Sequence, residues 1–306
     1  MFTARPPAKL NLTLEVAPRG EDGFHRLRSV FLRIGLSDWL TVRQAVAEHD
    51  RLTVGSAKSV PLEGNIVLRA LSLVRQRAGL DLLALDVQLD KQIPVAAGLA
   101  GGSSDGAAML DLAAACWGVG LSPQLRLELA AELGSDVPFF ATQAAAALVE
   151  GRGELVTPLP GVEGRPGVLL VSPPIEISTA AAFARFDDLG QAPARDSVTS
   201  ELADAFRAGL DARGLLEWSD RLRMANDLWA SAISLAPELA GLREALEAGS
   251  GRPWLMTGSG SALFALYASP QEAVAAGHAL SDDKALGEAL VVATDLEGPD
   301  PAWRYP

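Results

Sequence analysis

Cysteine is almost absent from this sequence: the chain of 306 residues contains one, Cys116, in the apolar stretch AAACW. A single thiol cannot form an internal disulfide, so the fold does not depend on an oxidising compartment. Its apolar surroundings indicate that Cys116 is a small core residue rather than a reactive thiol.

Positive charge is also scarce. The 26 Lys and Arg face 38 Asp and Glu, the formal net charge is −12, and basic residues form no block. Because phosphate backbones are bound by clustered Lys and Arg, we predict no nucleic-acid partner. The N-terminus lacks the layout of a signal peptide, and no apolar run reaches the roughly 18 residues of a membrane helix. These absences predict a cytoplasmic protein without a membrane partner.

Several familiar motifs are missing as well. The three histidines, His25, His49 and His278, show no metal-ligand spacing such as H-E-x-x-H, so we expect no metal site made by the protein alone. No Gly-Lys pair occurs, which excludes a P-loop. A dinucleotide fingerprint is excluded in the glycine-rich stretch, because Ala100 stands where its second glycine would be.

The length favours two domains, and strands and helices are mixed without regular alternation, which predicts an α+β fold. Residues 8–16, AKLNLTLEV, alternate strictly, which predicts a half-buried strand with Lys9 and Asn11 on its polar face. We predict further strands within 29–36, 39–46, 83–94, 168–174, 254–268 and 288–298. Helices are expected over 65–79, 103–119, 122–134 and from 177, and a linker within 158–167.

The stretch KQIPVAAGLAGGSSDGAAML, residues 91–110, leads from a predicted strand through glycines into a predicted helix. Ser103, Ser104 and Asp105 are residue types that cap a helix N-terminus, where backbone amides also attract anions. Alone, the stretch fits a phosphate cradle and an ordinary connection equally well. The same ambiguity holds elsewhere: Asp136 could be a turn residue, Lys9 a solvated lysine, and TGSGS at 257–261 a tight hairpin.

Five stretches together resolve this ambiguity. PAKLNLTLEV, DGFHRLRSVF, the glycine stretch, LGSDVPFF with GRGE, and TGSGSALFAL follow one another between residues 7 and 266. In this order they resemble the GHMP kinases, small-molecule kinases named for galactose, homoserine, mevalonate and phosphomevalonate. PAKLNL, DGFH and GSDVPFF resemble, more narrowly, the family that phosphorylates 4-diphosphocytidyl-2-C-methyl-D-erythritol in non-mevalonate isoprenoid synthesis.

The resemblance implies a two-domain α+β fold with the active site between the domains. Residues 1–158 would form a ribosomal-protein-S5-like N-terminal domain that binds ATP, and residues 159–306 a ferredoxin-like C-terminal domain. The implied reaction is ATP-dependent phosphorylation of the tertiary 2-hydroxyl of the CDP-linked methylerythritol. The implied partners are these two small molecules and Mg²⁺, in a monomer or a homodimer.

Site residues carry over from matching motif positions. Asp136 matches the catalytic aspartate that accepts the hydroxyl proton, and Lys9 matches the lysine that pairs with it. Substrate contacts are expected from Asn11, Phe24, His25, Thr179 and Phe183, with His25 against the cytosine edge. The ATP phosphates would lie against Pro94, Ala96, Gly98, Leu99, Ala100, Gly101, Gly102, Ser103 and Ser104.

Three positions depart from the family pattern: Phe24 replaces a tyrosine, Ala100 a glycine and Gly106 an alanine. Phe24 keeps a ring for stacking but loses a hydroxyl. Ala100 would cost roughly 1 kcal/mol if its φ angle is positive. Two alternatives remain: another GHMP kinase of homoserine or mevalonate type, which has no use for DGFH, and a non-catalytic binder, which has little use for both Lys9 and Asp136.

Overall fold

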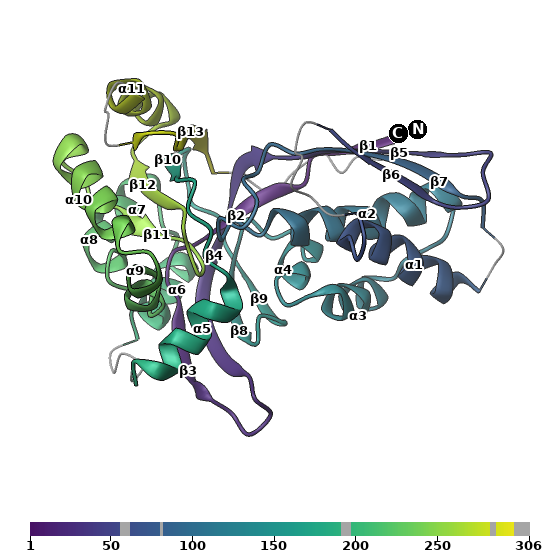
Figure 1. Ribbon diagram of the computed structural model, residues 1–306, viewed down its shortest axis with the longest axis horizontal. Helices are drawn as coiled ribbons and strands as arrows, with labels where there is room; N and C mark the ends of the chain where they lie inside the picture. The colour runs from purple at the N-terminus through teal and green to yellow at the C-terminus, as the bar shows by residue number, and fades with distance from the viewer. Residues whose placement is uncertain (56–61, 80–81, 191–196, 282–285, 297–306) are drawn as a thin grey trace.

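The computed structural model describes residues 1–55, 62–79, 82–190, 197–281 and 286–296. Within them the strands form three sheets, arranged along the long axis of the molecule (Figure 1). One sheet belongs to a lobe built mainly from the first half of the chain, one to a lobe from the second half, and the third lies between them. The mixture of antiparallel strands and helices confirms the α+β prediction.

The first lobe has a four-stranded sheet in the order β1-β5-β7-β6, of which only the β6–β7 pairing is parallel. Its strands are β1 (Phe2–Ala4), β5 (Trp39–Gln44), β6 (Arg51–Val54) and β7 (Leu85–Asp90). The helices that share its apolar core are α1 (Ile66–Ala78), α2 (Gly101–Trp117), α3 (Pro123–Leu133) and α4 (Val137–Ala141). The apolar residues of this half therefore form one core that holds α2 in place.

Helix ends in this lobe follow local signals. The side chain of Asn65 accepts a hydrogen bond from the Val67 N–H at the start of α1, and Gly79 ends the helix in the left-handed conformation. Ser122 caps α3, with Pro123 at its first position. The helices predicted over 65–79 and 122–134 are therefore confirmed. The start of α2 was predicted wrongly: the helix begins at Gly101, so the Ser-Ser-Asp run lies inside the helix, within its first two turns.

The central sheet has the order β2-β4-β8-β9, and β3 pairs with β4. Its strands are β2 (Pro7–Asn11), β3 (Glu15–Arg19), β4 (His25–Ser37), β8 (Ala146–Gly151) and β9 (Leu155–Leu159). Along β4, Phe31 packs into the core of the first lobe, whereas Val30 and Leu32 pack on the opposite side. Both faces of this sheet are covered.

This double coverage corrects the prediction for residues 8–16. Instead of one half-buried strand there are two, β2 and β3, because Leu14 leaves the sheet and exchanges backbone hydrogen bonds with Ala225 and Asp227. The polar face is not solvated either: Lys9 and Asn11 are 3% and 4% exposed. A lysine buried at this position needs polar partners, which the next subsection describes.

The second lobe carries an antiparallel sheet in the order β11-β12-β10-β13. Its strands are β10 (Gly167–Ser172), β11 (Leu255–Met256), β12 (Leu263–Tyr267) and β13 (Leu290–Asp295). Its helices are α5 (Thr179–Asp188), α6 (Val198–Arg207), α7 (Ala212–Glu217), α8 (Ser219–Leu222), α9 (Trp229–Leu235), α10 (Glu238–Ser250) and α11 (Pro270–Ser281). The last predicted strand is confirmed as β13; residues 297–298 of that prediction lie outside the described residues.

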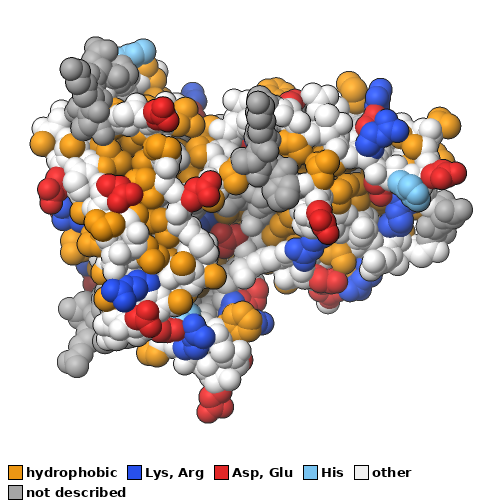
Figure 2. All heavy atoms as spheres, in the orientation of Figure 1, with side chains coloured by type: hydrophobic (Ala, Val, Ile, Leu, Met, Phe, Trp, Pro, Cys, Tyr) orange, Lys and Arg blue, Asp and Glu red, His pale blue; other side chains and the backbone are white. Residues whose placement is uncertain are grey.

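The two lobes are joined through the central sheet. Helix α6 packs on β4 and β9, and β13 also contacts β4. Residues 160–166 connect β9 to β10, within the predicted linker. The proposed division of the chain at 158/159 stays a prediction. Figure 2 shows acidic and basic side chains interspersed over one face of both lobes.

Candidate active site

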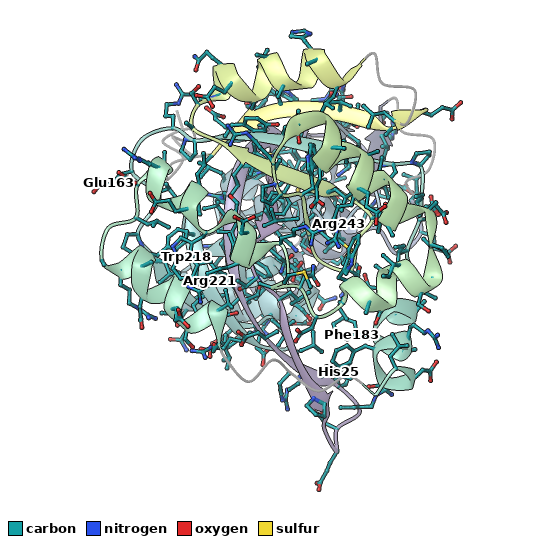
Figure 3. The ribbon with its side chains drawn as sticks, turned by 90° about the vertical axis from the view of Figure 1, so that its left-hand side faces the viewer. His25, Glu163, Phe183, Trp218, Arg221 and Arg243 are labelled. Atoms are coloured by element: carbon teal, nitrogen blue, oxygen red, sulfur yellow. The ribbon has the colours of Figure 1, made fainter. Side chains whose placement is uncertain are left out.

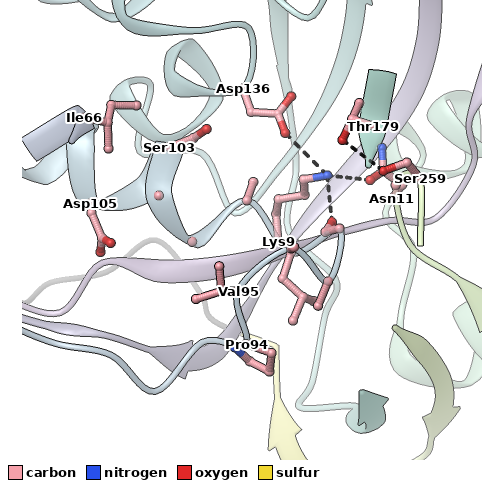
Figure 4. A pocket seen from close by; sticks show the side chains of 18 of the residues that line it. Lys9, Asn11, Ile66, Pro94, Val95, Ser103, Asp105, Asp136, Thr179 and Ser259 are labelled. Carbon is pink, nitrogen blue, oxygen red and sulfur yellow. Dashed lines mark hydrogen bonds and ion pairs between the residues drawn. The ribbon is translucent and has the colours of Figure 1, made fainter. Parts of the chain in front are cut away.

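A cavity of about 550 Å³ lies at the junction of the lobes (Figure 4). Segments from both halves of the chain line it: β2, the stretch 94–103, the start of α4, the start of α5 and the turn at 258–259. Its volume and its mixed polar and apolar lining suit a small-molecule site.

Lys9 and Asp136 meet in this cavity. Lys9 Nζ lies 3.5 Å from Asp136 Oδ2, donates to Asn11 Oδ1 at 2.5 Å and to the Gly98 carbonyl at 3.2 Å. The ammonium also lies 4.6 Å from the centre of the Phe31 ring. Burial lowers the pKa of Lys9, and the Asp136 carboxylate opposes this by favouring the charged form. The pair is thus a partly desolvated lysine with one loosely held carboxylate.

Asn11 is held from two directions. Its N–H donates to Thr257 Oγ1 at 3.0 Å, and its side-chain amide donates to Ser29 Oγ at 2.9 Å. Thr257 belongs to the TGSGS stretch, so the second lobe fixes the polar face of β2. Asn11 in turn orients the ammonium of Lys9.

Asp136 is not a capping residue. It precedes the short helix α4, but its side chain makes no capping hydrogen bond and extends towards Lys9 instead (Figure 4). About 29% of this side chain is exposed. The ordinary turn role considered from sequence is therefore replaced by an ion pair that faces the cavity.

The glycine stretch forms a tight loop with several residues in the left-handed region. The φ angles of Ala96, Gly98 and Ala100 are 57°, 78° and 54°. Only glycine fits at 98, because a Cβ there would lie 2.3 Å from the Thr257 carbonyl oxygen. Ala100 does have a positive φ, so its conformation costs on the order of 1 kcal/mol relative to glycine. The TGSGS turn connects β11 and β12, and through Thr257 it also packs directly against Gly98 of this loop.

Most predicted site residues come together around the cavity. The lining contains Lys9, Asn11, Asp136, Thr179 and Phe183, and from the loop Pro94, Ala96, Gly98, Leu99, Ala100, Gly101, Gly102 and Ser103. Thr179 Oγ1 lies 3.1 Å from Ser259 Oγ. Ser104, Phe24 and His25 do not line it. Ser104 points into the protein, where its hydroxyl is buried and has no hydrogen-bond partner among the described residues.

His25 lies just behind the lining. Its ring stacks on Phe183, with centroids 5.2 Å apart and planes 28° apart (Figure 3). Nδ1 lies 2.8 Å from the Ala17 carbonyl, and Nε2 lies 3.2 Å from Asp187 Oδ1. Phe24 is half exposed and stacks with the Arg152 guanidinium at 4.7 Å. Contacts of Phe24 and His25 with cytosine stay predictions.

Sequence reasoning missed a second lysine. Lys91 and Asp105 line the cavity, and Lys91 forms ion pairs with both Asp105 and Asp38. A signal was present, since Asp105 stands in a run of small and apolar residues where a carboxylate needs a partner. Asn65, which caps the start of α1, also lines the cavity.

The described residues contain no group of three or more His, Cys, Asp or Glu side chains arranged to hold a metal ion. Nor does any helix in the described ranges have both the length and the apolar character needed to span a bilayer.

Two family models match this chain, one in each half. The model of the GHMP kinases N terminal domain matches residues 65–144, and that of the GHMP kinases C terminal matches residues 208–285. A 4-diphosphocytidyl-2-C-methyl-D-erythritol kinase of Synechococcus sp. (strain CC9605) is 38% identical over 280 residues, covering 87% of this chain and 88% of that protein.

Solved structures extend the comparison to the fold. A 4-(cytidine 5'-diphospho)-2C-methyl-D-erythritol kinase has a TM-score of 0.74 at 30% identity, covering 97% of this chain and all of that chain. A homoserine kinase from Cytophaga hutchinsonii has a TM-score of 0.69 at 17% identity, covering 97% and 95%. The second likeness is one of fold alone.

Proposed function

The chain belongs to the 4-diphosphocytidyl-2-C-methyl-D-erythritol kinase family of GHMP kinases, and from this we propose that it transfers the γ-phosphoryl group of ATP to the 2-hydroxyl of that substrate. The observation that carries the proposal is the Lys9–Asp136 pair, which faces a cavity whose wall is the glycine loop. A protein that only binds nucleotide or sugar would gain little from a buried lysine aimed at a carboxylate.

In the proposed reaction the acceptor hydroxyl lies beside the Lys9–Asp136 pair, within hydrogen-bonding reach of both side chains. The carboxylate of Asp136 orients this hydroxyl and accepts its proton as the oxygen attacks the γ-phosphorus. The Lys9 ammonium orients the carboxylate and stabilises negative charge on the attacking oxygen. Phosphoryl transfer depends mainly on positioning and charge stabilisation, so this small set of groups suffices.

The loop and the start of α2 would hold the ATP phosphates. Helix α2 has 17 residues, and its first backbone N–H groups, at Gly101, Gly102 and Ser103, lie where the loop meets the cavity. Orphan N–H groups and the helix dipole favour an anion at such a place. Left-handed residues allow the loop backbone to turn closely around a phosphate.

Mg²⁺ is expected to arrive with ATP. Hard oxygen ligands are available at the cavity, from the Ser103 hydroxyl and the partly exposed Asp136 carboxylate, so the residues fit an ion held mostly by phosphates. When bound, the ion neutralises charge on the β- and γ-phosphates.

The reaction is tested by an ADP-release assay with three acceptors. We expect turnover with 4-diphosphocytidyl-2-C-methyl-D-erythritol and none with homoserine or mevalonate. Turnover with homoserine instead would refute the acceptor and leave the kinase class intact. Absence of turnover with every acceptor, despite nucleotide binding, would favour a non-catalytic binder.

Recognition of the cytidyl group is tested at His25. Because its ring stacks on Phe183, which lines the cavity, His25→Ala should raise KM for the cytidyl substrate about tenfold or more while KM for ATP changes little. Phe24→Ala is measured beside it for comparison. Phe24 precedes His25 in the chain but stacks with Arg152 at the surface. Equal rises of both KM values in His25→Ala would indicate a structural role.

A further inference from the structure

Three ionisable residues join the two ends of the phosphate loop. Lys91 stands at the end of β7, where the loop begins, and Asp105 lies in the first turns of α2, where the loop has ended. Lys91 Nζ donates to Asp105 Oδ2 at 2.9 Å and to Asp38 Oδ2. Asp38 comes from the turn between β4 and β5. We call Asp38, Lys91 and Asp105 the loop clamp.

Asp38 also holds the loop backbone directly. Its Oδ1 accepts hydrogen bonds from the N–H groups of Gln92 and Ile93, at 2.6 Å and 2.8 Å. The two oxygens of one carboxylate therefore have separate tasks: Oδ1 fixes the first loop residues, and Oδ2 fixes the lysine that reaches α2. Charge-assisted hydrogen bonds of this kind are shorter and stronger than neutral ones.

The clamp is buried, so solvent screens its charges only weakly. Asp38 is fully buried, and the side chains of Lys91 and Asp105 are 7% and 2% exposed. Gly101 leaves the space that the lysine needs, because a Cβ at 101 would lie 3.1 Å from Lys91 Nζ. Loss of Lys91 would leave two buried carboxylates without a compensating charge.

The loop that the clamp encloses is strained. Ala96 and Ala100 both have positive φ angles, which alanine adopts only when surrounding contacts impose them. Asp38, in contrast, does not line the cavity, so it has no direct contact with a bound nucleotide to make. Its effect on the nucleotide has to pass through the loop.

Resting on the proposed kinase function, we propose that the loop clamp holds the phosphate loop in its nucleotide-binding shape before ATP arrives, which makes Asp38 a positioning residue for ATP outside the cavity. A loop released from the clamp populates this shape only part of the time. The apparent affinity for nucleotide falls by that fraction, whereas the Lys9–Asp136 pair keeps its geometry.

The test is Asp38→Asn in the full chain. Asparagine keeps an oxygen for the Gln92 and Ile93 N–H groups but turns an NH₂ group towards Lys91, so it breaks the ion pair between Asp38 and Lys91. We expect KM for ATP, and Kd for a non-hydrolysable ATP analogue, to rise about tenfold or more. KM for the acceptor and kcat should stay within about threefold of wild type.

Asp86→Asn is the matched control. It removes a carboxylate from β7 in the same sheet and breaks the exposed Arg43–Asp86 pair, 2.7 Å in length. We expect no change in Kd for the analogue. Analogue binding requires no acceptor, so a failed proposal on the acceptor and a failed clamp give different results.

Hydrogen–deuterium exchange of the nucleotide-free protein gives a second readout. Asp38→Asn should speed exchange in residues 92–104 and leave the central sheet at wild-type rates. If Asp38→Asn does not fold, the double variant Lys91→Met/Asp105→Asn, which keeps Asp38, should show the same local increase. An unchanged analogue Kd, or exchange that rises uniformly over the chain, would overturn the proposal.

Discussion

Two buried lysines adjoin the phosphate loop, and their surroundings differ. Lys9 has one carboxylate at 3.5 Å, whereas Lys91 has two within hydrogen-bonding distance. Burial lowers the pKa of Lys9 and the Asp136 carboxylate restores only part of it. Burial also acts on Lys91, but there Asp105 and Asp38 prevail and raise its pKa.

The difference separates a reacting pair from a supporting one. Asp136 keeps part of its carboxylate exposed to the cavity, so a substrate hydroxyl can enter beside it. Asp38 already accepts hydrogen bonds from Lys91 and from the Gln92 and Ile93 N–H groups, and it does not face the cavity. This suits a residue that holds the loop in one position. Burial of a lysine therefore says little about its role until the number and distance of its carboxylates are known.

The largest expected effect comes from the Lys9–Asp136 pair. Asp136→Asn should lower kcat about 10³-fold, because it removes the proton acceptor while keeping the shape of the side chain. Kd for a non-hydrolysable ATP analogue should remain within about threefold, measured by calorimetric titration. The double variant Lys9→Met/Asp136→Asn should be about as slow as the slower single variant, since the two act as a unit. A kcat near that of wild type would remove Asp136 from the mechanism.

The second prediction concerns the loop clamp, which has two carboxyl groups for one lysine. Burial raises the pKa of Asp105 to about 8. The nearby Asp38 carboxylate also raises this pKa, whereas the Lys91 ammonium lowers it. The folded state therefore holds a proton that the unfolded state releases near pH 4, and stability falls as pH rises from about 4 to about 8. Asp105→Asn relieves this loss and leaves Lys91 balanced by Asp38.

Urea unfolding at several pH values checks it. We expect Asp105→Asn to stabilise the protein by at least about 1 kcal/mol at pH 9 and to be near neutral at pH 4. Asp111 offers a comparison, because burial raises its pKa to about 6, so the gain from Asp111→Asn should level off near pH 6. A gain from Asp105→Asn that does not vary with pH would contradict the assignment.

The third prediction compares the lysines directly. The chain has only four, Lys9, Lys58, Lys91 and Lys284, so ¹³Cε-lysine labelling gives few NMR signals to assign. Lys9 should lose its proton below pH 10.5, and Lys91 should keep its proton above that value. Asp136→Asn should lower the titration of Lys9 further, since the carboxylate favours the ammonium. Equal titration midpoints for Lys9 and Lys91 would contradict the proposed difference between their electrostatic surroundings.

The smallest expected effect is in the loop between the two sites. Ala100→Gly relieves a positive φ angle but adds freedom to the unfolded chain, so a gain of at most about 1 kcal/mol is expected in urea unfolding. Gly98→Ala is the opposite case, because its Cβ would collide with the Thr257 carbonyl. Destabilisation by Ala100→Gly would mean that the methyl group contributes more by packing than its backbone angle costs.

Features with local causes were predictable from the sequence. The ends of α1 and α3 follow from Asn65, Gly79, Ser122 and Pro123, whose partners lie within a few residues. The α+β class followed from the mixture of patterns, and the family from five stretches in order. The reaction came from that resemblance, because Lys9 and Asp136 taken singly had ordinary explanations.

Features that depend on distant residues were not predictable. The polar face of β2 is buried because Thr257, 246 positions away, contacts Asn11. Lys91 finds Asp38 53 positions away. Alternation shows that a strand has two faces, but not what covers each of them, and neither pairing leaves a local pattern. The left-handed angle of Ala100 likewise depends on packing around the loop.

The close packing of Ile66 against Gly106 affects which side chains these two positions can carry in related sequences. A Cβ at 106 would lie 2.9 Å from Cγ1 and 3.1 Å from Cδ1 of Ile66, so the isoleucine of α1 occupies the volume that an alanine of α2 would need. Relatives with alanine at this position must then carry a smaller or differently placed side chain at the position of Ile66. We expect the two sites to change together during evolution, so that either substitution alone is poorly tolerated.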